Sequence, residues 1–91
     1  MISIGSYSGR WLDGANSVAI GRQALYGDGT NRLTGSDNIG IGFSTGYDLS
    51  TGDNNFLGGY QAGTNLTTGA SNVAIGQNAN GTSTTGTNNV A

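Results

Sequence analysis

Short runs in which apolar and small residues alternate recur along the chain, and a glycine follows each run. The clearest runs are Val18–Ile20, Ile39–Ile41 and Val73–Ile75, and Phe56–Gly58 is a looser copy. Their first and third side chains share one face of a strand, because successive side chains in a strand point to opposite faces. No segment has a helical apolar period. The pattern predicts short strands at these positions and an all-β fold.

The runs recur at a nearly fixed step. Asn38, Asn55, Asn72 and Asn89 each precede a run and lie 17 residues apart. Thr-Gly pairs at 34–35, 51–52, 68–69 and 85–86 keep the same step. The step from Ile20 to Ile41 is 21 residues, and the surplus falls between Leu25 and Arg32. The chain therefore divides into coils that start near 1, 17, 38, 55 and 72, with a partial coil from 89, in a single domain over residues 1–91.

A repeat of this length suits one coil of a parallel β-solenoid, or β-roll, here of about five coils. Coils stacked about 4.8 Å apart would superpose equivalent residues, so that Asn38, Asn55, Asn72 and Asn89 would form an asparagine ladder. The expected inward core consists of the larger motif residues, Val18, Ile20, Ile39, Ile41, Phe56, Val73 and Ile75. The small residues between them are expected to point outward, where a second chain could approach closely.

The composition provides few large apolar side chains for that interior. Gly, Asn, Thr and Ser account for more than half of the 91 residues, and Ile, Leu, Val and Phe for under one fifth. About two large apolar side chains in each coil offset little of the backbone entropy lost on ordering, roughly 1–2 kcal/mol per residue. A monomer would be marginally stable, so we expect a homo-oligomer wound around a common axis.

Several classes of function are disfavoured by what the sequence lacks. There is no cysteine or histidine, which removes the commonest metal ligands and general base, and we expect no cofactor, no metal and no enzymatic activity. With only three arginines and a net charge of -2, the chain cannot form the basic surface that binds nucleic acid. No apolar run is long enough to insert into a membrane. Asp28 and Asn31 could offer oxygen ligands to calcium, but an ordinary insertion loop is the favoured interpretation.

The motifs NSVAIG at 16–21, SNVAIG at 71–76 and DNIGIG at 37–42 resemble the head repeats of trimeric autotransporter adhesins. With the Thr-Gly turns and the longer step, they look still more like repeats in bacteriophage tail fibres and other virion fibres. The resemblance implies a parallel β-roll that associates as a homotrimer. A virion protein needs neither an export signal nor a membrane anchor, and neither is recognisable in this sequence. This favours the phage interpretation if the chain is complete, whereas truncation explains both absences equally well.

The sequence thus predicts a structural component of a phage tail fibre or similar virion appendage, with other virion subunits as partners. One alternative is the head segment of a bacterial adhesin on the cell surface, and another is an ice-binding solenoid that presents Thr34, Thr51, Thr68 and Thr85. A host-surface glycan is a candidate ligand, because aromatic side chains stack on sugars. The candidate contact residues for a ligand or partner are Trp11, Tyr26, Asp28, Asn31, Tyr47 and Tyr60.

Overall fold

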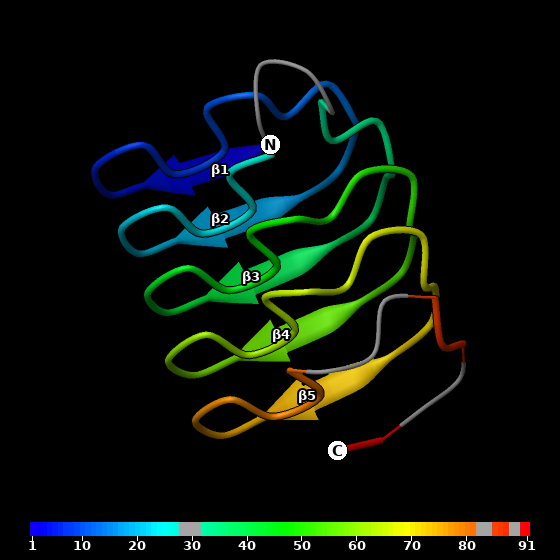
Figure 1. Ribbon diagram of the computed structural model, residues 1–91. Helices are drawn as coiled ribbons and strands as arrows, with labels where there is room; N and C mark the ends of the chain where they lie inside the picture. Colours follow the sequence, from blue (N-terminus) through cyan, green and yellow to red (C-terminus); the bar gives the residue numbers. More distant parts are fainter. Residues whose placement is uncertain (28–31, 82–84, 88–89) are drawn as a thin grey trace.

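The computed structural model describes residues 1–27, 32–81, 85–87 and 90–91 as a β-solenoid of about four turns. It contains five strands of three residues each: β1 (Ile2–Ile4), β2 (Val18–Ile20), β3 (Ile39–Ile41), β4 (Phe56–Gly58) and β5 (Val73–Ile75). They form one parallel sheet in sequence order, and the two termini lie at opposite ends of the stack (Figure 1). The predicted all-β solenoid is confirmed.

The register between strands superposes equivalent motif residues. Val18 pairs with Ile39, Ile39 with Phe56, and Phe56 with Val73. Beyond the sheet, backbone hydrogen bonds continue from coil to coil at the turns, as in Leu25 N–H to the carbonyl of Thr45 at 2.8 Å. The backbone of a coil is therefore satisfied chiefly by the coils above and below it, as a solenoid requires.

Tight corners explain the glycine, asparagine and serine content. Each strand is followed by a glycine with φ between 115° and 126°, at Gly5, Gly21, Gly42, Gly59 and Gly76. This backbone conformation is essentially limited to glycine. The Thr-Gly glycines have another role, since a Cβ on Gly35 would lie 1.9 Å from the carbonyl oxygen of Gly52 in the next coil. The coils approach so closely here that no side chain fits.

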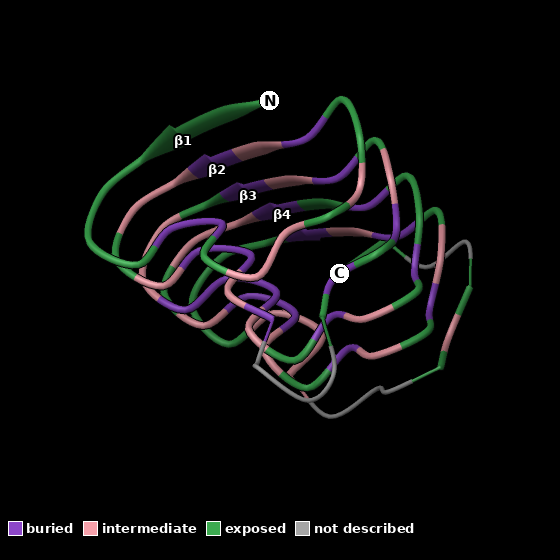
Figure 2. Ribbon diagram, turned by 90° about the horizontal axis from the view of Figure 1, so that it is seen from above, coloured by how far each residue is buried: buried purple, intermediate pink, exposed green. Residues whose placement is uncertain are grey.

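The core lies on the side of the sheet opposite to the one predicted. The middle residues Ala19, Leu57 and Ala74 are completely buried, whereas Ile41, Phe56 and Ile75 are 42%, 43% and 62% exposed. Figure 2 shows the buried positions along the inside of the coils. The whole predicted core set points away from the interior: Val18, Ile20, Ile39, Ile41, Phe56, Val73 and Ile75 are half-buried or exposed. That prediction was wrong in direction, although these residues do share one face.

The reason is the narrowness of the coil. Leucines from the wall facing the sheet, including Leu25, Leu49 and Leu66, fill the interior and are completely buried. Even a Cβ on Gly40 would lie 2.8 Å from Cγ of Leu25. Where a leucine of the facing wall already occupies the space, the strand contributes a small residue, and the bulky β-branched residues point outward. Leu57 fits in the interior because glycines stand beside it: a Cβ on Gly46 or Gly63 would lie 2.9 Å from its side chain.

Candidate functional site

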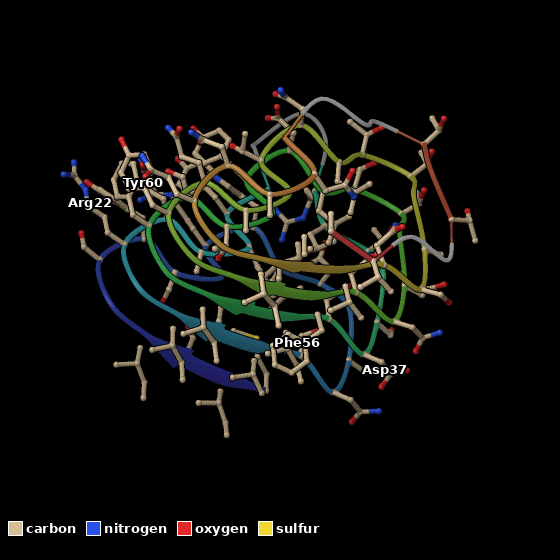
Figure 3. The ribbon with its side chains drawn as sticks, turned by 90° about the horizontal axis from the view of Figure 1, so that it is seen from below. Arg22, Asp37, Phe56 and Tyr60 are labelled. Atoms are coloured by element: carbon tan, nitrogen blue, oxygen red, sulfur yellow. The ribbon has the colours of Figure 1, made fainter. Side chains whose placement is uncertain are left out.

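The outward side of the sheet carries a continuous column of large apolar side chains, which we call the apolar face. Its members come from the first and third positions of the strands, extended by Val90 in register with Val73. The apolar face comprises Ile2, Ile4, Val18, Ile20, Ile39, Ile41, Phe56, Val73, Ile75 and Val90. Phe56 projects from its middle, between edges marked by Tyr60 and Asp37 (Figure 3). None of its members is charged, which sets it apart from an ordinary solvated surface.

The exposed area of this face is large for so small a chain. Ile2, Ile4, Ile41, Phe56, Ile75 and Val90 are each between 42% and 83% exposed. Such side chains leave on the order of 500 Å² of apolar surface in contact with water. The largest patch on a typical monomer is of the order of 300–600 Å², and a specific interface buries about 800 Å² per partner. The apolar face therefore equals the largest apolar patch of an ordinary monomer in a chain of only 91 residues, which makes it a candidate interaction surface.

Behind the sheet, the asparagine ladder runs through the interior edge of each coil. Asn38, Asn55 and Asn72 are at most 1% exposed, and Asn89 lies outside the described residues. The Asn55 amide nitrogen Nδ2 donates to Oδ1 of Asn38 at 3.0 Å, and Asn72 repeats the contact to Asn55 at 3.1 Å.

Each of the three amides also caps a Thr-Gly corner. Nδ2 of Asn38, Asn55 and Asn72 donates to a glycine carbonyl of the same coil at 2.8–3.0 Å. Each of Asn55 and Asn72 donates its backbone N–H to Oδ1 of the asparagine in the preceding coil, at 3.0 Å. Ser17 occupies the ladder position in the coil of β2, where its Oγ accepts from Asn38 N–H at 3.2 Å. The ladder therefore holds strand and corner in a constant relation from coil to coil.

In the part of the coils that follows strands β1, β2 and β3, aromatic and arginine side chains form what we call the arginine–aromatic cluster: Tyr7, Arg10, Trp11, Tyr26, Arg32 and Tyr47. The rings of Tyr26 and Tyr47 stack at 4.8 Å, and Tyr7 meets Tyr26 edge-on at 6.3 Å. The Arg10 guanidinium lies 5.1 Å from the Tyr7 ring and 5.2 Å from the Trp11 ring, and Arg32 covers Trp11 at 5.3 Å.

The three arginines differ in their partners. Arg32 forms an ion pair with Asp13, with Nη2 2.7 Å from Oδ1, and this contact lowers the pKa of the Asp13 carboxyl. In the described part of the chain, neither Arg10 nor Arg22 has a carboxylate partner. Arg22 lies 6.0 Å from the Phe43 ring, which stacks on Tyr60 at 5.2 Å, and Arg22 and Tyr60 mark the same edge in Figure 3.

Of the predicted contact residues, the structure brings Trp11, Tyr26 and Tyr47 into one cluster and places Tyr60 in a separate stack with Phe43. Asp28 and Asn31 lie outside the described residues. The sequence prediction missed the pairing of arginines with rings. The signal was available, because Arg10, Tyr26 and Tyr47 each follow a motif glycine by five residues, and Arg22, Phe43 and Tyr60 each follow one directly.

The extra residues between Leu25 and Arg32 interrupt the backbone hydrogen bonds between coils at a defined point. Trp11 N–H donates to the carbonyl of Tyr26, and the Trp11 carbonyl accepts from Leu33 N–H, both at 3.0 Å. One residue of the first coil thus bonds to residues on both sides of the insertion, and Leu12 forms a parallel bridge with Leu33. The surplus residues therefore fall between two intact stretches of coil.

Other candidate chemistry is sparse in the described residues. They contain no group of three or more His, Cys, Asp or Glu side chains that could hold a metal ion. The same residues include no helix that is long and apolar enough to cross a membrane. Thr34, Thr51, Thr68 and Thr85 are exposed, each beside a corner glycine.

Comparison with known proteins yields no relative for this chain: no family model, no curated protein and no solved structure matches it.

Proposed function

We propose that this chain is a structural segment of an oligomeric fibre, in which three copies associate in parallel through the apolar face. The observation that carries the proposal is the length of that face: uncharged and largely exposed, it follows the sheet from Ile2 to Val90. Burying about 500 Å² of it per chain would contribute of the order of 10 kcal/mol before the cost of association. A fibre segment needs such a lateral contact along its whole length.

Parallel association about an axis along the stack also suits a fibre, because it leaves both ends of the solenoid free to continue into other segments. The number of three chains comes from the resemblance of the SVAIG-like motifs to virion-fibre and adhesin repeats. A phage tail fibre or similar virion appendage is the proposed setting, in contact with other virion subunits. The head of a bacterial surface adhesin is the alternative, and the same interface would serve it.

The test is the mass of the protein in solution. Native mass spectrometry and analytical ultracentrifugation at micromolar concentration should give three chains for the parent. Ile41→Asp places a carboxylate on the apolar face without burying it in the single chain, so this variant should remain folded by circular dichroism but run as one chain. The matched control is Thr68→Asp, at an exposed corner outside the face, which should keep the parent mass. A parent that is a stable, folded monomer would overturn the proposal.

A second role, contact with an acidic saccharide, is favoured by Arg10. Its guanidinium lies against the Tyr7 and Trp11 rings with no carboxylate partner in the described residues. Exposed rings stack on the apolar faces of sugars, and a guanidinium binds a carboxylate through two parallel hydrogen bonds. The arginine–aromatic cluster therefore offers the two contacts that a uronic or sialic acid residue needs.

This second role is tested by glycan-array binding and by titration with glucuronate. Arg10→Gln should abolish binding of acidic glycans while the oligomer mass stays unchanged. Arg22→Gln, at the separate Phe43–Tyr60 stack, is the control and should bind as the parent does. Binding that is absent in the parent, or that survives Arg10→Gln, would exclude this site.

A further inference from the structure

Strand β4 differs from its neighbours on the apolar face. At the first position it carries Phe56, which is 43% exposed, and at the third position it carries Gly58. In register above and below Gly58 are Ile41 and Ile75. A Cβ built on Gly58 would meet nothing within 4 Å. The apolar face therefore has a protruding ring and an empty notch two residues apart on the same strand (Figure 3 labels the ring).

Threefold association brings a ring and a notch from different chains together. Around an axis parallel to the stack, the three copies of a strand circulate in the same sense. The end of one copy then lies beside the start of the next, as in any closed head-to-tail ring. At each level the third residue of one chain consequently faces the first residue of its neighbour. At the level of β4 these two residues are Gly58 and Phe56.

We infer that Phe56 of each chain packs into the notch at Gly58 of the neighbouring chain and thereby fixes the register of the three chains. This inference rests on the proposed parallel trimer. With the chains displaced by one coil, Phe56 would meet Ile41 or Ile75 instead of Gly58, and the notch would face Ile39 or Val73, which fill less of it than phenylalanine does. Overpacking and a cavity each cost stability, so only the aligned arrangement avoids both. The irregular strand thus acts as a register key in an otherwise repetitive interface.

The decisive variant is Gly58→Ile, because it should raise the melting temperature if the notch is open and lower it if Phe56 of a neighbour fills the notch. If the notch is open to solvent, isoleucine in place of glycine favours the strand and should raise the melting temperature. If Phe56 of a neighbour fills it, the added side chain clashes, and the melting temperature should fall by about 5–10 °C. Phe56→Val should also lower it, since a cavity remains. The double variant Phe56→Val/Gly58→Ile restores the pattern of β2 and β5 and should melt near the parent.

Strand β5 supplies the matched control. Val73→Phe adds the same ring one coil away, where Ile75 closes the third position, and should lower the melting temperature. Val73→Phe/Ile75→Gly recreates the pairing of ring and notch there and should recover most of the loss. Additive effects in both strands would overturn the register key.

Cross-linking tests the contact directly, because the chain has no cysteine of its own. Under oxidation, Phe56→Cys/Gly58→Cys should give a covalent trimer on a non-reducing gel, since disulfides require Cα atoms about 4.4–6.8 Å apart. Phe56→Cys/Ile75→Cys, displaced by one coil, should not. A parent of one-chain mass would defeat the proposed function itself. A parent of three-chain mass with no covalent trimer, or with a stabilising Gly58→Ile, would defeat only the register key.

Discussion

The two faces of the single sheet are built from opposite kinds of residue. The inner face presents Ala19, Gly40, Leu57 and Ala74, which pack against leucines and asparagines contributed by the rest of each coil. The outer face presents isoleucine, valine and phenylalanine, and much of their surface meets water in the single chain. The difference shows that bulk is not a marker of the interior in a narrow solenoid. The width of the coil limits the interior to leucines, asparagines and small residues, and the β-branched residues of the strands lie outside it.

A substitution in the asparagine ladder, on the inner side of the sheet, should cause the largest loss of unfolding free energy. Asn55→Leu keeps a similar volume but removes the hydrogen bonds that Asn55 Nδ2 donates to Asn38 Oδ1 and to the Gly69 carbonyl, and leaves Asn72 N–H without its acceptor. Each unsatisfied buried group costs about 1–3 kcal/mol, so unfolding free energy should fall by about 3–5 kcal/mol. Urea denaturation measures this loss. Gln77→Leu, at an exposed position, is the control, and an equal loss there would mean that the ladder contributes nothing special.

Two adjacent side chains of β4 allow the faces to be compared directly. Leu57 is completely buried, so Leu57→Ala should cost about 2–4 kcal/mol at every protein concentration. If the proposed trimer forms, Phe56→Ala should show a loss of stability that grows with protein concentration, because the contribution of Phe56 would then depend on association. Thermal melts over a hundredfold range of concentration distinguish the two. Identical concentration dependence for both variants would contradict the division between core and interface.

The close packing of Gly40 against Leu25 tests how narrow the interior is. Leu25 is completely buried and has a left-handed φ of 46°, which leucine rarely adopts. Gly40→Ala should lower the unfolding free energy by about 1–3 kcal/mol, because the added methyl collides with Leu25. In a Leu25→Ala background the same substitution should cost little. A double-mutant cycle gives the coupling, and additivity would show that the cost of the methyl comes from a contact other than Leu25, such as Thr45 Oγ1, which would lie 3.0 Å from it.

The smallest expected effect concerns the exposed ion pair between Asp13 and Arg32. The neighbouring guanidinium lowers the folded-state pKa of the Asp13 carboxyl below its usual value of 3.8. The pair therefore contributes fully above the unfolded-state pKa, and the contribution is lost as pH falls through the lowered value. Asp13→Asn should flatten the stability profile slightly on the acid side of pH 4, and salt should diminish the difference. An unchanged profile would show that water screens the pair completely.

Much of the architecture was predictable because the repeat can be recognised from the spacing of residues in the sequence. The step of 17 residues, the superposed asparagines and the glycine after each strand all follow from spacing. The clustering of Arg10 with Tyr7 and Trp11 was less accessible, because it depends on how side chains lean across coils of unequal length. The insertion near Tyr26 was located by counting, and the bonds of Trp11 to Tyr26 and Leu33 agree with that position.

The sequence by itself determined that the chain is a parallel β-solenoid with stacked equivalent residues, since period and alternation are properties of the order of residues alone. Alternation shows that Val73 and Ile75 share a face, but it is symmetric with respect to the two sides of a sheet. Only the tertiary structure decided which side is inside, because that depends on what Leu25, Leu49 and Leu66 bring from the opposite wall. Those leucines leave no room inside the coil for β-branched side chains. The valines and isoleucines of the strands therefore point outward and form the apolar face.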